Sequence, residues 1–376
     1  MRVGLVSWWF NRGQATVMRT LRHALDELGH ETHVLARPTA SDFERPEFIS
    51  SEGVWADHKR LTAASASDIP KSEYVAWAAA NELDVCFFFQ NLDFAGIGAM
   101  RDLGVRTIGT YMWESFDAQQ ARAADAVFDV VYAMNEPSAA RYVELGLTEV
   151  AKVRFAAHPD LAKAPRPDRA PSEAVRFVFM AGYLRARKPL GAIVEGFRRG
   201  ARQGAALTVK AQIPVRRGDL VVAGSAPEIS QRYQDAPGLA DLGSDAIRVV
   251  TDDLHEDDYL RELQTHDVVV GVSRWEGLGL HLYECEALGI PLLLNHMEPY
   301  VDYAHDGGRC LLVASHSIGT RKSGIEIHEP DLDSLASAFE QLSSRDEVDR
   351  LRTMNQIDHA ERWRQFRRDI EPLLGT

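Results

Sequence analysis

Two glutamates eight positions apart, Glu276 and Glu284, have the residue type and spacing to hold a ligand. They lie in a segment, residues 268–295, whose pattern predicts a strand, a glycine-containing loop, a helix and a second strand. Gly277 and Gly279 in the loop leave room for ligand atoms to approach the backbone. A carboxylate accepts hydrogen bonds and a hydroxyl group donates them. Two carboxylates facing one ligand therefore suit a sugar or a nucleoside.

The helix that carries Glu284 is expected over residues 280–288, because Gly289 suits the position just past a helix end and Pro291 stops the helix from continuing. Its N-terminus presents backbone N–H groups that have no partner inside the helix, together with the positive end of the helix dipole. At the carboxyl edge of a parallel sheet, such a helix end suits a diphosphate. The segment thus predicts a site for a ligand with both hydroxyl and anionic groups.

The elements that must position this site alternate between strand and helix patterns. In the first part of the chain, apolar runs predict strands, separated by stretches long enough for crossover helices. The expected strands are residues 3–7, 32–36, 85–89, 105–110 and 127–133, with an amphipathic helix at about 16–28. Further on, strands are expected at 177–180, 207–211, 247–250, 268–272 and 291–295, with a loop at 182–189 and a helix at about 190–199. This alternation predicts an α/β fold with two Rossmann-like domains.

The boundary between the domains is expected at residues 159–174, where four prolines stand among Ala, Arg and Asp and favour an extended linker. We expect an N-terminal domain at residues 1–165 and a C-terminal domain at 174–350. The charged tail, residues 349–374, has helical periodicity, which is typical of a solvated terminal helix. A helix at about 355–376 that packs back on the N-terminal domain is the alternative.

The composition narrows the class of partner. The 376 residues include 42 Lys plus Arg and 55 Asp plus Glu, a formal charge of −13. This acidic balance disfavours nucleic acid and anionic membranes as partners, and no apolar run approaches the ~20 residues of a membrane-spanning helix. Three widely spaced cysteines give no disulfide framework or thiolate metal site. A cytoplasmic protein without integral membrane association is expected.

The sequence Ser-Arg-Trp-Glu-Gly-Leu-Gly-Leu from Ser273, followed by Glu-Cys-Glu-Ala-Leu-Gly-Ile-Pro, resembles the E-x7-E signature of retaining GT-B glycosyltransferases, family four. The resemblance covers residues 177–313 well and the first part of the chain mainly in its layout. It implies two Rossmann-like domains facing across a cleft, with the acceptor on the N-terminal domain and a nucleotide-sugar donor on the C-terminal domain.

The resemblance also implies roles for individual residues of the segment. Glu276 is expected to contact hydroxyl groups of the donor sugar, and Glu284 to hold the ribose of the nucleotide. The backbone amides of the glycine loop are expected to touch the sugar and the phosphates; they belong to Gly277, Leu278, Gly279 and Leu280.

A second family element is an Arg that is followed five positions later by a Lys, both binding the diphosphate. In the loop at residues 182–189, Lys188 occupies the lysine position, whereas Tyr183 occupies the arginine position. Arg185 or Arg187 from the same loop is the expected substitute, and Arg187 is taken as the donor-binding residue with Lys188. Together with Glu276, Lys188 is the expected catalytic residue, because it faces the charge of the leaving diphosphate.

The N-terminal domain departs from the family pattern. Many members carry a His near the reacting sugar, but residues 110–117 contain none, and Glu114 and His158 are the candidate substitutes. Gly13, in the first strand-to-helix loop, either closes against a donor phosphate or merely makes a turn. The pairs at residues 252–253 and 257–258 are adjacent aspartates, expected to cap a helix at 254–263 rather than to bind a metal.

The resemblance implies a metal-independent transferase that moves a sugar from a nucleotide-sugar donor to an acceptor hydroxyl with retention of anomeric configuration. The acidic charge favours a small soluble acceptor. No cofactor is expected beyond the nucleotide sugar as co-substrate, and the oligomeric state stays open. Two alternatives remain: a GT-B nucleotide-sugar epimerase or hydrolase, and a non-catalytic protein that binds a nucleotide sugar.

Overall fold

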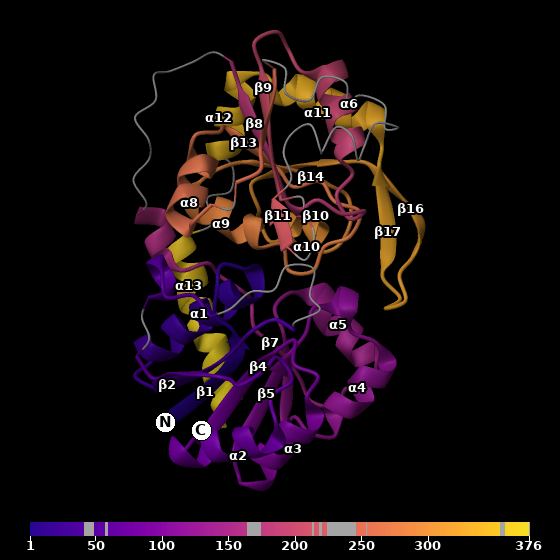
Figure 1. Ribbon diagram of the computed structural model, residues 1–376. Coiled ribbons are helices and arrows are strands. Elements are labelled where there is room, and N and C mark those ends of the chain that lie inside the picture. The colour runs from indigo at the N-terminus through magenta and orange to yellow at the C-terminus, as the bar shows by residue number, and fades with distance from the viewer. Residues whose placement is uncertain are drawn as a thin grey trace. The chain divides into compact units, whose positions relative to one another are not determined.

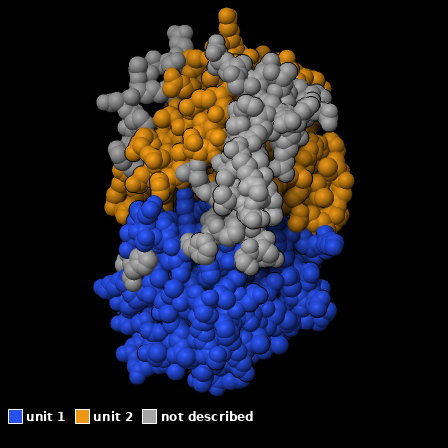
Figure 2. Space-filling view, in the orientation of Figure 1, with its two compact units in different colours: residues 1–158, 322–324, 360–376 blue, residues 159–321, 325–359 orange. Residues whose placement is uncertain are grey.

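The computed structural model describes residues 1–40, 49–56, 59–163, 174–212, 214–217, 220–223, 246–252, 254–353 and 358–375. Its contacts divide the chain into two compact units (Figure 2). Unit 1 comprises Met1–His158, Lys322–Gly324 and Ala360–Thr376, and unit 2 comprises Pro159–Arg321 and Ile325–His359. Most of the expected linker, residues 164–173, lies outside the described residues.

Unit 1 contains a sheet of seven parallel strands in the order β3-β2-β1-β4-β5-β6-β7 (Figure 1). The strands are β1 (Arg2–Trp8), β2 (Glu31–Arg37), β3 (Leu61–Ala63), β4 (Val85–Phe89), β5 (Arg106–Thr110), β6 (Val130–Ala133) and β7 (Val150–Lys152). All five residues of β4 are buried, as a near-continuous apolar run in a parallel sheet requires. The short strands β3 and β7, at the two edges of the sheet, were not predicted from the sequence.

Five of the described helices of unit 1 connect successive strands of its sheet. They are α1 (Gly13–Glu27), α2 (Lys71–Ala80), α3 (Phe94–Asp102), α4 (Ala118–Asp125) and α5 (Glu136–Glu144), with short 3₁₀ turns η1 (Gly53–Trp55) and η2 (Trp113–Ser115). The predicted helix at 16–28 is α1. It begins three residues earlier than expected.

The expectation of a solvated terminal helix is wrong. The tail contains α12 (Arg345–Thr353) in unit 2, then α13 (His359–Ile370) and the turn η5 (Glu371–Leu374), which lie in unit 1 from Ala360 onward. Trp363, Phe366 and Ile370 of α13 are buried. The helix lies beside α1 (Figure 1), where Trp363 Nε1 donates a hydrogen bond of 2.9 Å to Glu27. Apolar residues at helical spacing give α13 a buried face that its high charge obscures in the sequence.

Unit 2 contains a second parallel sheet, of six strands in the order β12-β9-β8-β13-β14-β15. These strands are β8 (Arg176–Tyr183), β9 (Ala206–Gln212), β12 (Ile247–Val250), β13 (Val268–Val270), β14 (Leu292–Asn295) and β15 (Cys310–Val313). Two antiparallel hairpins add β10 (Pro214–Arg217) with β11 (Leu220–Ala223), and β16 (Ser315–Thr320) with β17 (Glu326–Pro330). The two parallel sheets confirm the predicted α/β fold.

The helices of unit 2 are α6 (Leu190–Gly200), α8 (Glu256–Gln264), α9 (Leu280–Leu288), α10 (Tyr300–His305), α11 (Leu332–Leu342) and α12, with the turn η3 (Pro159–Lys163). The predicted helix at 280–288 is α9 with the same ends. Figure 1 shows α6 and α11 side by side, and both contribute to the apolar core of the unit.

The strand order of unit 2 determines which loops meet. The chain runs outward from β8 through β9 to β12, then returns to β13, which pairs directly with β8, and runs outward again through β14 to β15. The loops that leave the carboxyl ends of β8 and β13 therefore start side by side at the point where the strand order reverses. Ligands of doubly wound sheets bind at such a point.

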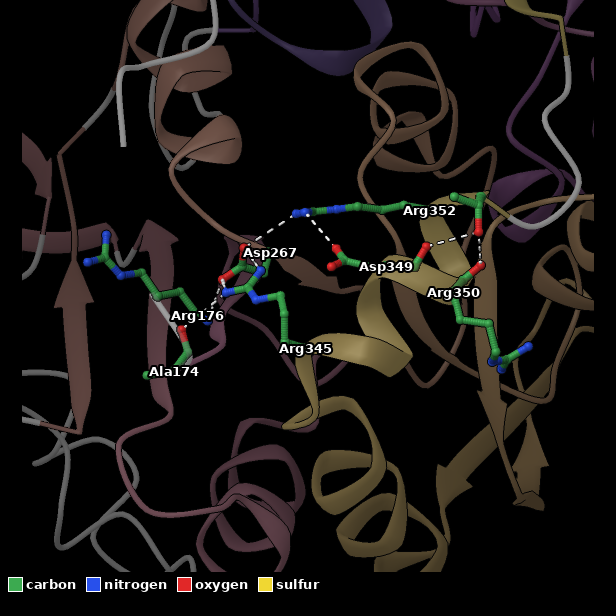
Figure 3. A network of polar contacts seen from close by, with 8 residues as sticks. Ala174, Arg176, Asp267, Arg345, Asp349, Arg350 and Arg352 are labelled. Carbon is green, nitrogen blue, oxygen red and sulfur yellow. Dashed lines mark hydrogen bonds and ion pairs between the residues drawn. The ribbon is translucent and has the colours of Figure 1, made fainter. Parts of the chain in front are cut away.

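A polar cluster at the amino end of β13 ties α12 to this sheet (Figure 3). The buried carboxylate of Asp267 accepts hydrogen bonds from Arg345 (Nη1 to Oδ1, 2.7 Å) and Arg352 (Nη2 to Oδ1, 3.3 Å) of α12. It also accepts one of 2.9 Å from the backbone N–H of Arg176, which begins β8. One carboxylate thus joins two central strands and a helix.

Replacing Asp267 with Asn should lower the free energy of unfolding by about 1–3 kcal/mol, because hydrogen bonds to a buried charge are lost. Asp349→Asn is the matched control, since Asp349 is exposed and contacts Arg352 at 3.4 Å; its effect should be near zero. Urea unfolding followed by circular dichroism compares the two variants. Equal, small effects from both would show that the cluster does not stabilise the unit.

Candidate functional site

The loops after β8 and β13 meet at a cluster of three charged side chains, of which Glu276 and Lys188 are buried and Arg187 is partly exposed. Glu276, from the loop after β13, accepts a hydrogen bond of 2.7 Å from Arg187 Nη1 at Oε1. Its Oε2 accepts one of 3.1 Å from Lys188 Nζ. Glu276 is 6% exposed and Lys188 is 3% exposed. The structure thus brings together three of the residues that the sequence predicted for the site, from segments almost ninety positions apart in the chain.

Backbone hydrogen bonds fix the two loops against each other. The N–H of Arg274 donates to the carbonyl of Arg187 at 2.7 Å. The N–H of Ser273 in turn donates to Asn295 Oδ1, at the end of β14, at 2.9 Å. These contacts join the loop that carries Arg187 to the loop that carries Glu276 and to the end of β14.

Tyr300 is a fourth member of the cluster, and the sequence analysis missed it. The side chain is fully buried, and its hydroxyl lies 2.6 Å from the carbonyl of Gly271 and 3.4 Å from Glu276 Oε2. A phenol has one hydrogen to donate, so the shorter contact with Gly271 is the stronger hydrogen bond. Tyr300 begins α10, just after β14. A position shortly after a strand of the sheet is the one sequence feature that could have indicated it as a site residue.

The charges of the cluster set the protonation of its members. Burial acts to raise the pKa of Glu276, but the charges of Arg187 and Lys188 outweigh it and hold this pKa far below its usual range. Burial lowers the pKa of Lys188 to about 8, against the opposing pull of Glu276. At pH 7 the three side chains carry a net charge of +1, which suits an anionic ligand.

His281 adds no charge to this site. Burial, together with the positive charge of Lys188, lowers the pKa of its imidazole to about 3. Its Nε2 has no hydrogen-bond partner within the described part of the chain. A Cβ on Gly271 would lie 2.6 Å from this nitrogen, so a larger residue there would have to displace the imidazole.

The N-terminus of α9 lies next to Glu276 in the chain. Its N-cap is Gly279, which has a φ of 73° that favours glycine and no side chain with which to cap the helix. The N–H of Gly277 donates to Glu276 Oε1 at 3.2 Å, and Leu278 is buried. The first N–H groups of α9, beginning at Leu280, therefore have no side-chain cap and keep their capacity to bind an anion.

Glu284 lies about one turn inside α9 and is half-buried. Its Oε2 accepts a hydrogen bond of 2.6 Å from the hydroxyl of Tyr259, a residue of α8. The sequence predicted Glu284 as a site residue but did not predict this partner, because nothing in the residue pattern shows which residues of α8 face α9.

The remaining predicted residues have less defined places. Gly13 begins α1 in unit 1 and is exposed. Arg185 is exposed, whereas Arg187 reaches Glu276, so of the two candidate substitutes Arg187 is the one in the cluster. The side chain of Tyr183 lies outside the described residues, although its backbone extends β8 into the predicted loop.

The two candidates for a catalytic group in unit 1 lie in different surroundings. The ring of His158 lies 4.6 Å from that of His23 and 5.1 Å from that of Trp363, between α1 and α13. Glu114 lies in η2, just beyond the carboxyl end of β5. The contacts of His158 are thus those of a residue packed between two helices. Of the two candidates, Glu114 is the one at the carboxyl edge of the sheet, where ligands of such folds bind.

The aspartate pairs do not cap α8 as expected. The helix begins at Glu256, with His255 as its N-cap. Asp257 and Asp258 lie in its first turn, where their negative charges interact favourably with the positive end of the helix dipole. Asp258 pairs with Arg261 at 2.5 Å. Asp253 lies outside the described residues. Across the residues that the structure describes, no group of three or more His, Cys, Asp or Glu side chains is arranged to hold a metal ion.

No family model and no curated protein matches the sequence. Solved structures match along nearly all of it. A glycosyltransferase from Rickettsia africae ESF-5 gives a TM-score of 0.70 at 11% identity, over 99% of this chain and 97% of that one. The E. coli trehalose-6-phosphate structure bound with UDP-2-fluoro glucose gives 0.66 at 12% identity, over 100% and 99%. Sucrose-phosphate synthase (tll1590) from Thermosynechococcus elongatus gives 0.65 at 15% identity, over 99% and 98%.

The chain has the GT-B fold. Two parallel-sheet Rossmann-like units, of seven and six strands, confirm the predicted fold class. The structural similarity establishes the fold, and because the sequence identities are low, the reaction has to be argued from the residues. Among the described residues, no helix combines the length and the apolar character that crossing a membrane requires.

The depressed pKa of Lys188 makes a prediction for anion binding. Since only the ammonium form attracts an anion, affinity for inorganic pyrophosphate should fall as the pH rises through about 8. Between pH 7 and pH 9 the loss should be about tenfold by calorimetry, relative to a Lys188→Met variant that corrects for titration of the ligand. The same pH dependence in wild type and Lys188→Met would show that Lys188 does not face the anion.

Proposed function

We propose that the protein is a retaining glycosyltransferase that moves a sugar from a nucleotide-sugar donor to a hydroxyl group of a small soluble acceptor. One observation carries the proposal: Arg187 and Lys188 converge with Glu276 beside the N-terminus of α9. Two cations and a helix end suit the diphosphate of a donor, and the carboxylate suits the hydroxyl groups of its sugar. The similarity of the fold to nucleotide-sugar enzymes supports the same conclusion.

The leaving group is the first chemical demand on the site. When the bond between the anomeric carbon and the diphosphate oxygen breaks, both electrons stay with that oxygen and the sugar becomes oxocarbenium-like. The charges of Arg187 and Lys188, with the N–H groups of α9, stabilise the negative charge that develops. The acceptor oxygen then bonds to the anomeric carbon on the same face, and its proton passes to the departing phosphate oxygen. No side-chain base takes part in this scheme.

Glu276 exchanges partners when the donor binds. Without donor its carboxylate neutralises part of the charge of Arg187 and Lys188 and compensates for their burial. The diphosphate replaces that negative charge, which leaves carboxylate lone pairs of Glu276 for the sugar hydroxyl groups. The charges of Arg187 and Lys188 are thus balanced by Glu276 without donor and by the diphosphate with donor bound.

No metal is needed in this scheme, because fixed cations carry the charge that a divalent ion carries in other transferases. The donor base and sugar are to be identified by thermal-shift screening with nucleoside diphosphates and nucleotide sugars. Assays in the presence of EDTA then measure transfer. Consumption of donor that requires an acceptor supports the proposal. Consumption without an acceptor indicates an epimerase or hydrolase, and binding without consumption indicates a non-catalytic binding protein.

The two glutamates should differ when each is replaced. Glu276→Ala should lower turnover more than donor affinity, because the cations remain while the sugar loses its orientation. Glu284→Ala should weaken nucleotide binding by about 1–3 kcal/mol, through lost charged hydrogen bonds to the ribose. Steady-state kinetics and calorimetry separate the effects, with the exposed Asp258→Ala as control. Small, equal effects from both glutamates would contradict the site assignment.

A further inference from the structure

A tyrosine that the sequence did not predict as a site residue is hydrogen-bonded to Glu284, one of the two glutamates of the site. The hydroxyl of Tyr259 donates a hydrogen bond of 2.6 Å to Glu284 Oε2. The two residues come from α8 and α9, the helices that precede and follow β13. This short contact between a phenol and a carboxylate is of the charge-assisted kind, which is roughly twice as strong as a neutral one.

The phenol stays a donor throughout the working range of pH. Burial raises the pKa of Tyr259 well above its ordinary value, and the negative charge of Glu284 raises it further. A neutral phenol has one hydrogen, and here that hydrogen points to the carboxylate. The interaction therefore does not depend on a titration near neutral pH.

The position of the phenol is set by packing. Leu260 and Leu263 of α8 are buried in unit 2 and hold the helix that carries Tyr259. Glu284 is half-buried on α9 and has a flexible side chain of its own. A hydrogen bond from a fixed donor to one oxygen restricts the rotamers of this carboxylate. The entropic cost is small, because the donor is already held in place by the packing of α8.

We propose that Tyr259 is a positioning residue that orients Glu284 toward the ribose of the nucleotide, and so sets a preference for ribonucleotides over deoxyribonucleotides. This inference rests on the proposed function, in which Glu284 binds the ribose. A carboxylate has about four lone-pair sites, so it can accept hydrogen bonds from ribose hydroxyl groups in addition to the one from Tyr259. To accept hydrogen bonds from two hydroxyl groups on adjacent carbons, the carboxylate plane must have one orientation. The hydrogen bond from Tyr259 holds the carboxylate in that orientation.

The test measures how strongly the site discriminates between ribose and deoxyribose. Calorimetry gives the affinity of the wild-type chain for UDP, GDP and ADP, and for the 2′-deoxy and 3′-deoxy forms of whichever of them binds. Tyr259→Phe removes only the hydroxyl group. Tyr303→Phe is the matched control, since its hydroxyl also contacts α9 but at the carbonyl of Leu282, at 3.3 Å. Glu284→Gln tests the carboxylate itself.

Tyr259→Phe should weaken binding of the ribonucleoside diphosphate by about five- to tenfold and change binding of the deoxy forms little, so that the discrimination ratio falls. Turnover at saturating donor should change less than twofold, because the reacting atoms are untouched. Tyr303→Phe should keep the wild-type ratio. A merely structural role for Tyr259 would weaken all the nucleotides alike and leave the ratio unchanged, which would overturn the inference.

Failure of the inference is distinguishable from failure of the proposed function. If Glu284→Gln loses the discrimination while Tyr259→Phe keeps it or binds the ribonucleotide more tightly, Glu284 holds the ribose but Tyr259 does not position it. If Glu284→Gln keeps the discrimination, or if none of the three nucleoside diphosphates binds the wild-type chain, the proposed donor site is wrong and the inference fails with it.

Discussion

A buried carboxylate must be compensated, and in this protein the compensation of Glu276 organises the candidate site. A carboxylate in a low-dielectric interior is costly unless cations and hydrogen-bond donors surround it. Glu276 accepts hydrogen bonds from Arg187 and Lys188 at 2.7 and 3.1 Å, whereas the hydroxyl of Tyr300, 3.4 Å from the carboxylate, directs its hydrogen to the carbonyl of Gly271. The carboxylate and the two cations hold one another in place. Under the proposed function, the same three groups bind the nucleotide sugar.

The sheet topology of unit 2 makes this compensation possible. Since β8 and β13 are neighbours, their loops begin side by side although their sequences are far apart. The loop after β8 brings the cations, and the loop after β13 brings the carboxylate and leads into α9. Tyr300 follows β14, the next strand in the sheet, and Tyr259 precedes β13 on α8. The site is therefore built around three neighbouring strands of the sheet, β8, β13 and β14, where the strand order reverses.

Much of the fold and the centre of the site could be predicted from local sequence signals. Gly289 and Pro291 mark the end of α9, and the glycine loop marks its beginning, so both ends of this helix were predicted correctly. Glu276 was predicted from its spacing to Glu284 and from the resemblance to the family signature, and Lys188 from its match to the lysine position of the family's diphosphate-binding loop. These features depend on residues close together in the chain.

The parts that the sequence did not predict depend on packing between distant elements. The choice of Arg187 over Arg185 follows from which side of the loop faces Glu276, and the partnership of Tyr259 with Glu284 follows from the rotation of α8 against α9. The packing of α13 depends on Glu27, more than three hundred positions away, and on Phe155, whose ring lies 5.6 Å from that of Phe366. Local periodicity cannot predict these contacts, because each depends on the position of a second element that is distant in the chain.

The central claim is that the cations beside Glu276 bind the diphosphate of a donor. A crystal structure of the chain with its tightest-binding nucleoside diphosphate tests this most directly. The account predicts phosphate oxygens within hydrogen-bond distance of Lys188 Nζ and the Arg187 guanidinium, with the ribose at Glu284. A nucleotide bound elsewhere, with Arg187 and Lys188 still paired only to Glu276, would contradict it.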